Sequence, residues 1–169
     1  MRVFLIGFMG SGKSHWGKQL AAQLQMPYID LDAKIIDSEK RSIAEIFEDS
    51  GEEYFRMIEK ETLYSLVEEN ESVVISCGGG TPCFFNNIGY MKKQGIVVWL
   101  NTHVDVLLQR LIQEKSQRPL IRDIPDDGLK TYIVRKLNER RMYYDQANVV
   151  IDNENSISPA IFIQTILHA

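Results

Sequence analysis

The sequence predicts an α/β domain in which a parallel sheet of five strands is covered by helices on both faces. Five short apolar runs, bounded by turn-forming residues, are the expected strands: residues 3–6, 28–31, 73–75, 96–100 and 149–151. Helical patterns lie between these runs, and such alternation is typical of parallel sheets. A chain of 169 residues with 44% apolar residues suits a single domain, residues 1–169, with a complete core.

The first helix is expected directly after a glycine-rich segment. Trp16 and Leu20 mark its apolar face, and Pro27 ends it. A short helix is expected from Ala33, with Asp32 as its N-cap.

The next helix has a clear start and an interruption. Ser42 and Glu45 form a capping box at its N-terminus, and Gly51 breaks the pattern, which then continues to the third strand. One further helix is expected after Pro82, and another begins near Val104 and carries a broad apolar face.

Residues 115–128 are polar, are broken by Pro119, Pro125 and Gly128, and have no apolar periodicity. A loop of this length in a compact domain is usually functional or disordered. We therefore expect a mobile lid here, followed by a helix over residues 129–146. An amphipathic helix over residues 157–166 would close the domain.

Residues 7–14 read Gly-Phe-Met-Gly-Ser-Gly-Lys-Ser and lie between the first strand and the first helix. This spacing and context form the phosphate-binding P-loop pattern, whose backbone, including Gly10, Ser11 and Gly12, can wrap around a polyphosphate. Lys13 can reach the β- and γ-phosphates, and the Ser14 hydroxyl can ligate Mg²⁺. An ordinary glycine-rich turn is the alternative, but the loop, Lys13, Ser14 and the flanking elements all agree. The segment predicts binding of a nucleoside triphosphate.

Two carboxylates, Asp30 and Asp32, follow the second strand. Alternate residues of a strand share one face, so we expect both to point toward the phosphate site. One can hold Mg²⁺ through water, and the other can accept a hydrogen bond from a substrate hydroxyl. Helix capping is the competing interpretation of this tripeptide.

Arginines recur in the remaining polar motifs. Arg56 and Glu59 suit a surface ion pair, or a pair in which Glu59 orients Arg56 to bind a carboxylate with both arms of its guanidinium group. Arg118, in the expected lid, either covers the γ-phosphate or is solvated. Arg140 and the adjacent Arg141 offer a second contact to an anionic substrate, or a solvated helix face.

The third strand ends in three glycines, Gly78, Gly79 and Gly80. Consecutive glycines have a high conformational entropy when unfolded and pack no side chain. They therefore either allow another group to approach the main chain closely or form a tight turn. We expect another group to approach this segment closely.

Composition narrows the functional classes. The net charge of −4 provides no basic footprint for nucleic acid, and no apolar run is long enough to span a membrane. We expect no signal peptide, since residues 3–6 lead straight into the phosphate loop. Cys77 and Cys83 are too few for a disulfide framework and suit a reducing compartment. We expect a cytoplasmic monomer.

Together the motifs resemble the shikimate kinases, within the nucleoside-monophosphate-kinase-like P-loop proteins. The resemblance rests on Gly-x4-Gly-Lys-Ser, Asp-x-Asp, Phe-Arg-x-x-Glu, Gly-Gly-Gly and Arg-Pro-Leu in this order, and it runs nearly end to end. It implies a three-layer P-loop kinase fold. It also implies phosphorylation of the shikimate 3-hydroxyl by Mg-ATP, on the route to chorismate and the aromatic amino acids. The substrate-binding segment would be residues 32–60, and the lid residues 115–128.

The resemblance also implies residue roles. Lys13 would contact the transferred phosphate, Ser14 would ligate Mg²⁺, and Asp30 would support the ion through water. Asp32 would hold the shikimate hydroxyls, although sequence does not decide whether it removes the proton. Arg56 and Arg140 would bind the shikimate carboxylate, in a pocket lined by Gly78, Gly79 and Gly80. Arg118 would be the lid arginine. Arg110 and Pro159 would contact the adenine.

Two other functions are compatible with a P-loop. A related kinase acting on gluconate or a nucleoside monophosphate would share residues 7–14 but has no evident need for Asp-x-Asp together with Arg56 and the glycine run. A catalytically idle nucleotide-binding module would not need Lys13, Ser14, Asp32 and Arg118 all intact.

Overall fold

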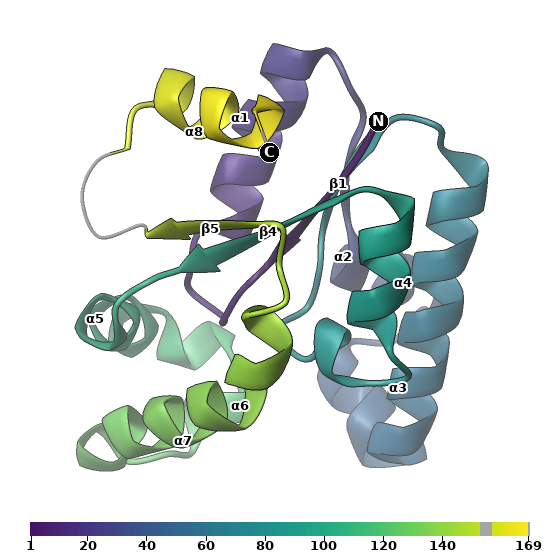
Figure 1. The fold of residues 1–169 in the computed structure, drawn as a ribbon. Coiled ribbons are helices and arrows are strands. Elements are labelled where there is room, and N and C mark those ends of the chain that lie inside the picture. Colours follow the sequence, from purple (N-terminus) through teal and green to yellow (C-terminus); the bar gives the residue numbers. More distant parts are fainter. Residues whose placement is uncertain (153–156, 169) are drawn as a thin grey trace.

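The computed structural model describes residues 1–152 and 157–168, and its centre is one parallel sheet with strand order β2-β3-β1-β4-β5 (Figure 1). The five predicted strands are confirmed, with bounds that differ by at most one residue. They are β1 (Arg2–Ile6), β2 (Tyr28–Asp30), β3 (Val73–Ser76), β4 (Ile96–Asn101) and β5 (Val149–Asp152).

The predicted helices lie in the expected order, and short helices that the sequence did not predict lie among them. They are α1 (Lys13–Leu24), α2 (Leu31–Glu39), α3 (Ile43–Glu69), α4 (Asn87–Gln94), α5 (Val104–Glu114), α6 (Pro119–Arg122), α7 (Asp126–Tyr144) and α8 (Pro159–Leu167), with short 3₁₀ helices η1 (Thr81–Cys83) and η2 (Lys115–Gln117). The capping box of Ser42 and Glu45 is confirmed, and Gly51 kinks α3 with φ 84°.

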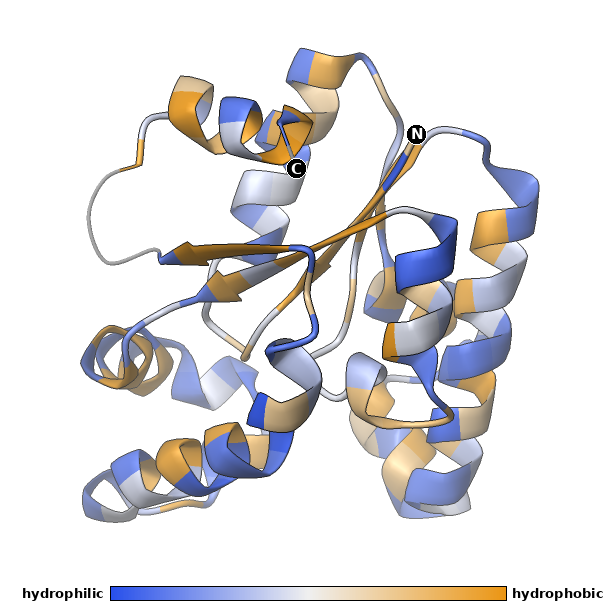
Figure 2. Cartoon of the chain, in the orientation of Figure 1, coloured by the Kyte–Doolittle hydropathy of each residue, from blue (hydrophilic) through white to orange (hydrophobic). Residues whose placement is uncertain are grey.

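Alternation along β1 separates two helical layers. Val3 and Leu5 pack against α1 and α8, whereas Phe4 and Ile6 belong to the core beneath α2, α3 and α4. Trp16, on the predicted apolar face of α1, and Trp99 of β4 are buried in these two cores. Figure 2 shows the apolar strands between helices whose outer faces are hydrophilic. The result is the predicted three-layer arrangement, which brings the C-terminal ends of the strands together at one edge of the sheet.

A third apolar cluster lies beside this edge. Phe8, from the phosphate loop, packs with Leu107 and Leu111 of α5, Ile121 of α6 and Leu129 of α7. This cluster connects the loop to the three helices that Figure 1 places next to the end of β4.

The expectation of a structureless segment over residues 115–128 is wrong. It contains η2, α6 and the first residues of α7, which begins at Asp126 rather than at residue 129. Helices of three or four residues are too short to produce an apolar periodicity, and here the single buried Ile121 ties α6 to the domain.

The expected cap of the second helix is also wrong. Asp30, not Asp32, is the N-cap of α2, since its carboxylate accepts a hydrogen bond from the Ala33 N–H at 3.1 Å. The strand ends at Asp30 and Asp32 lies in the first helical turn, so the two carboxylates do not share a strand face.

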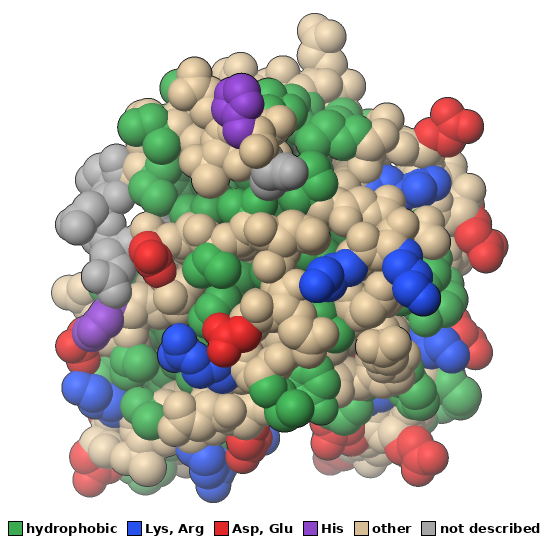
Figure 3. Space-filling model, viewed as in Figure 1, with side chains coloured by type: hydrophobic (Ala, Val, Ile, Leu, Met, Phe, Trp, Pro, Cys, Tyr) green, Lys and Arg blue, Asp and Glu red, His purple; other side chains and the backbone are tan. Residues whose placement is uncertain are grey.

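The surface in Figure 3 carries basic side chains interspersed with acidic ones on the face viewed. Within residues 1–152 and 157–168, no helix combines the length and the apolar character that crossing a bilayer requires. Cys77 is buried and Cys83 is half-buried, and both are free.

Candidate active site

The phosphate loop depends on backbone conformations that favour glycine. Gly7, Gly10 and Gly12 have φ values of 143°, 80° and 88°, in the region that L side chains rarely adopt. A Cβ on Gly7 would lie 2.8 Å from the Leu100 carbonyl oxygen. A hydrogen bond from the Ser11 N–H to the Phe8 carbonyl at 3.1 Å closes a turn in the loop. Helix α1 begins directly after the loop. Its N–H groups and the N-terminus of this helix form a potential anion site.

Lys13 is folded back onto the loop. Its Nζ donates to the carbonyl oxygens of Gly7 and Phe8 at 2.8 and 2.9 Å. Burial lowers the pKa of Lys13 to about 8, although nearby Asp32 opposes this shift. The ammonium group is thus poorly solvated, and both of these acceptors are neutral carbonyl oxygens, so an arriving phosphate would stabilise its charge.

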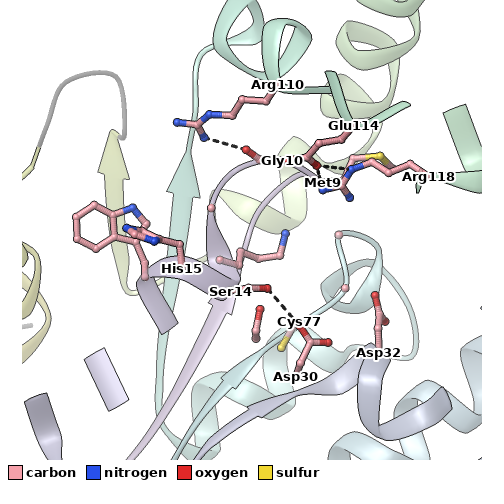
Figure 4. A pocket seen from close by; sticks show the side chains of 16 residues that line it. Met9, Gly10, Ser14, His15, Asp30, Asp32, Cys77, Arg110, Glu114 and Arg118 are labelled. Carbon is pink, nitrogen blue, oxygen red and sulfur yellow. Dashed lines mark hydrogen bonds and ion pairs between the residues drawn. The ribbon is translucent and has the colours of Figure 1, made fainter. Parts of the chain in front are cut away.

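Ser14 and Asp30 lie side by side in the cavity of Figure 4, and the Ser14 hydroxyl donates to Asp30 Oδ2 at 3.3 Å. Mg²⁺ is usually held by one or two protein oxygens together with phosphates and water. A hydroxyl and a carboxylate next to a phosphate loop fit this pattern. The described residues contain no group of three His, Cys, Asp or Glu side chains that would hold a metal without such additional ligands.

Asp32 lies across the same cavity from Arg118 (Figure 4). Burial, with Glu59 and Asp30 as like-charged neighbours, raises the pKa of Asp32 to about 6, against the attraction of Lys13 and Arg56. A carboxylate with this pKa is ionised near neutral pH and still has appreciable affinity for a proton, as a general base requires.

Arg56 is almost fully buried, at 9% exposure, in an aromatic and acidic environment. Its Nη1 donates to Glu59 Oε2 at 3.0 Å, and its guanidinium carbon lies 4.3 Å from the centre of the Phe84 ring. The pair is therefore not a surface ion pair. A guanidinium group in such surroundings can hold a carboxylate strongly.

Each glycine of the run makes room for a different functional side chain. A Cβ on Gly78 would lie 3.2 Å from Asp32 Oδ1, one on Gly79 would lie 2.9 Å from Arg140 Nη1, and one on Gly80 would lie 2.5 Å from Arg56 Nη2. None of the three has a positive φ, so glycine is needed here for space rather than for conformation. The close approach expected from the sequence is made by the protein's own side chains.

The two adjacent arginines of α7 point in different directions. Arg140 reaches the glycine run and lies over the Phe8 ring, whereas Arg141 is largely exposed, pairs with Asp145 at 3.5 Å and lies over Trp99. Successive residues of a helix are separated by about 100°, so only one of the two can face the site. Arg140 is the one that faces it.

Two cavities open at this edge of the sheet, with volumes of about 770 and 250 Å³. The larger one includes Lys13, Ser14, Asp30 and Arg110, and the smaller one includes Arg56, Glu59, Gly80 and Arg140. Both are lined by Met9, Asp32, Gly78, Gly79 and Arg118. The site thus has two compartments that meet between a carboxylate and an arginine.

Arg118 and Arg110 reach the larger cavity from the opposite side (Figure 4). Arg118 is paired with Glu114, to which its Nε donates at 2.8 Å, and Arg110 donates to the Gly10 carbonyl at 2.9 Å. Pro159 begins α8, is exposed, and lines neither cavity. Residues 153–156 before α8 lie outside the described part of the chain, so the adenine contact of Pro159 stays a prediction.

Three polar residues of the site were not identified from the sequence. Thr81 donates to Glu59 at 2.6 Å, the buried Tyr144 donates to the Gly79 carbonyl at 2.6 Å, and Glu114 holds Arg118. Burial raises the pKa of the Tyr144 phenol, which therefore remains a donor. The i,i+4 spacing of Glu114 and Arg118 is the only one of these contacts that a sequence pattern signals.

Comparisons with known proteins agree with this geometry. The family model for shikimate kinase matches residues 9–169. A shikimate kinase of Azobacteroides pseudotrichonymphae genomovar. CFP2 is 43% identical over 149 residues, which are 88% of this chain and 88% of the relative. The crystal structure of shikimate kinase from Bacteroides thetaiotaomicron matches with a TM-score of 0.90 and 38% identity, over 99% of this chain and 95% of that one.

A further match is the shikimate kinase from Acinetobacter baumannii in complex with shikimate, with a TM-score of 0.85 and 32% identity, over 99% of this chain and 90% of that one. The family model and the 43% identical relative both extend over most of the chain. The chain belongs to the shikimate kinase family of ATP-dependent kinases.

Proposed function

We propose that this site transfers the γ-phosphoryl group of ATP to the 3-hydroxyl of shikimate. The observation that carries the proposal is the junction of the two cavities, which share Asp32 and Arg118. A phosphate donor in the larger cavity and a carboxylate-bearing alcohol in the smaller one would meet between these side chains.

On the donor side, the backbone of Gly10, Ser11 and Gly12 binds the phosphates. Lys13 exchanges its two carbonyl acceptors for oxygens of the β- and γ-phosphates. Arg110, which lines the donor cavity, contacts the adenine together with Pro159.

Ser14 would hold Mg²⁺ directly and Asp30 would hold it through water, and their adjacent oxygens in the cavity support these roles. An ion held there would supply positive charge beside the phosphates. Asp30 also caps α2, so its carboxylate is already oriented before any ligand arrives.

On the acceptor side, Arg56 and Arg140 bind the shikimate carboxylate between Gly79 and Gly80. Asp32 accepts the hydrogen bond of the 3-hydroxyl. As the hydroxyl oxygen forms its bond to the γ-phosphorus, the bond from that phosphorus to the β–γ bridging oxygen breaks. ADP departs and the hydroxyl proton passes to Asp32. Positioning and charge neutralisation supply most of the rate enhancement in such a transfer.

Residues 115–128 act as a lid that closes when both substrates are bound. Arg118 then leaves Glu114 and stabilises charge on the transferred phosphoryl group. The expected result is slower amide hydrogen exchange of this segment with shikimate and a non-hydrolysable ATP analogue than without them. Equal exchange in both states would contradict closure.

The chain works as a cytoplasmic monomer. Its free cysteines suit a reducing compartment that also supplies ATP. In the described part of the chain, exposed large apolar side chains such as Met57, Met142 and Leu167 come from three different helices. Light scattering on the purified chain measures its molar mass in solution, and a mass above that of one chain would contradict the monomer.

The decisive experiment is a coupled assay of ADP release with shikimate, gluconate or AMP as the acceptor. We expect release that depends on shikimate and Mg²⁺, with gluconate and AMP close to the rate without acceptor. Preference for gluconate or AMP would identify a different small-molecule kinase. Nucleotide binding without ADP release from any acceptor would identify an idle module.

A further inference from the structure

Thr81 has a buried hydroxyl close to the acceptor cavity, although it does not line that cavity. It begins η1 directly after the glycine run and is 0% exposed. Its backbone N–H donates to the Gly78 carbonyl at 3.1 Å, and its own carbonyl accepts from Asn87 Nδ2 at 3.0 Å. With the main chain held on both sides, the Thr81 Oγ1 donates to Glu59 Oε1 at 2.6 Å.

Glu59 is a completely buried carboxylate whose two oxygens have different partners. Oε2 accepts from Arg56 at 3.0 Å, and Oε1 accepts from Thr81. A buried carboxylate is stabilised only when its charge is paired and its oxygens are hydrogen-bonded. Thr81 satisfies the oxygen that Arg56 Nη1 does not contact, so it restricts the rotation of the carboxylate.

The other anionic partner of Arg56 cannot replace this support. Glu52 meets Arg56 at 3.3 Å through an i,i+4 pair whose acidic side chain is 57% exposed. Exposed pairs of this kind contribute little to holding a side chain. Of the two carboxylates that contact Arg56, Glu59 is therefore the one that holds the guanidinium group, which also packs on the Phe84 ring.

Gly78 keeps the path between Thr81 and Glu59 open. A Cβ on Gly78 would lie 3.1 Å from both Thr81 Oγ1 and Glu59 Oε1. The glycine run thus accommodates this buried hydrogen bond as well as the side chains of the cavity.

We propose that Thr81 is a positioning residue for the acceptor: its hydroxyl fixes the Glu59 carboxylate, which in turn aims the Arg56 guanidinium into the smaller cavity. The inference rests on the proposed role of Arg56 in binding the carboxylate of shikimate. Thr81 itself touches neither substrate.

The test compares two substitutions in the full chain. Thr81→Val keeps the shape and removes the donor, whereas Thr81→Ser keeps the donor and removes the methyl group. We expect Thr81→Val to raise the Kd for shikimate about tenfold, as expected for the loss of one hydrogen bond to a charged partner, and to leave the KM for ATP within about twofold. Thr81→Ser should bind shikimate nearly as the unmodified chain does.

A matched control is Thr102→Val, which removes another buried hydroxyl, one that donates to the Ser11 carbonyl at 3.4 Å on the nucleotide side. Its Kd for shikimate should stay unchanged. In an Arg56→Ala background, Thr81→Val should add no further loss of shikimate binding, because Thr81 acts through Arg56.

An unchanged Kd in Thr81→Val, or an equal loss in Thr81→Ser, would overturn the inference. If Thr81→Val does not fold, Thr81→Cys, whose thiol is a weak donor, replaces it with the same expected direction and the same contradicting result. Failure of the unmodified chain to phosphorylate shikimate would instead refute the proposed function. The two failures are therefore distinguishable.

Discussion

The two compartments of the site are built in different ways. The donor compartment is centred on one contiguous segment, residues 7–14, whose main chain is shaped by three glycines with positive φ. The acceptor compartment combines side chains of α2, α3, α7 and residues 117–120 with the main chain of the glycine run, whose glycines serve only to leave room. Donor binding is therefore a property of local backbone, whereas acceptor binding is a property of long-range packing.

This difference has a functional consequence. A local loop can bind phosphate in any enzyme that contains it. The loop therefore indicates that a nucleotide binds but does not indicate which acceptor is phosphorylated. The selection of the acceptor requires Asp32, Arg56 and Arg140 to converge from distant parts of the chain. Substitutions in the two compartments should therefore separate ATP binding from shikimate binding, and substitution of the shared Arg118 should affect neither as much as turnover.

The largest effect is expected for Arg118→Ala. Removal of the arginine shared by both cavities should lower kcat by about 10³-fold or more, because it stabilises charge that develops in transfer, with little change in the KM for shikimate. Steady-state kinetics measures both. Arg122→Ala, on the exposed side of α6, is the control, and equal losses in kcat and shikimate affinity in Arg118→Ala would contradict this role.

Arg56→Ala should come next. Truncation leaves Glu59 buried without its charged partner and removes one contact to the acceptor, so the Kd for shikimate should rise by about 10²-fold. The KM for ATP should be spared. Arg141→Ala, an arginine that faces away from the site, should change neither value, and an unchanged shikimate Kd in Arg56→Ala would refute the assignment.

Asp32→Asn tests how much the ionised Asp32 carboxylate, where the two cavities meet, destabilises the ligand-free protein. Because the folded state raises the pKa of Asp32 from 3.8 to about 6, its ionised form destabilises the fold at higher pH. The stabilising contribution of the protonated form is complete below about pH 4 and is lost as the pH rises through 6.

We therefore expect Asp32→Asn to be more stable than the unmodified chain by about 1–3 kcal/mol at pH 7, while turnover is lost. The difference in the free energy of unfolding should vanish near pH 4. Urea denaturation from pH 4 to 8 measures it, with the exposed Asp37→Asn as the control. A variant less stable than the unmodified chain at pH 7 would contradict the prediction.

The smallest effect on the site is expected for Gly80→Ala, which adds a single methyl group. Gly80 has φ −91°, which alanine adopts, but its Cβ would displace the end of Arg56. Gly80→Ala should raise the Kd for shikimate about tenfold and lower stability by about 1–3 kcal/mol, because Arg56, which is held by Glu59 and packs on Phe84, must move. Gly12→Ala, where φ is 88°, should instead raise the KM for ATP and also lower stability. If Gly80→Ala changed the KM for ATP and Gly12→Ala changed the Kd for shikimate, the separation of the two compartments would be contradicted.

Sequence patterns predicted the strands closely because each depends on apolar residues within a few positions. The same holds for the phosphate loop and for the capping box of Ser42 and Glu45. Sequence patterns failed for residues 115–128, where the helices are short and α6 is held in place by the tertiary contacts of Ile121. They also failed for the cap of α2, since both Asp30 and Asp32 are suitable capping residues and only the end of β2 decides between them.

The amino-acid sequence by itself determined the order of strands and helices, the phosphate loop and, through the order of its motifs, the family to which the chain belongs. The family resemblance also selected Arg140 rather than Arg141 for the acceptor. Only the tertiary structure decided that each glycine of the run accommodates a different side chain and that Thr81 donates to Glu59. The physical reason is range. Backbone conformation responds to neighbouring residues, whereas the Thr81–Glu59 and Tyr144–Gly79 hydrogen bonds join positions 22 and 65 residues apart, which only the folded sheet brings together.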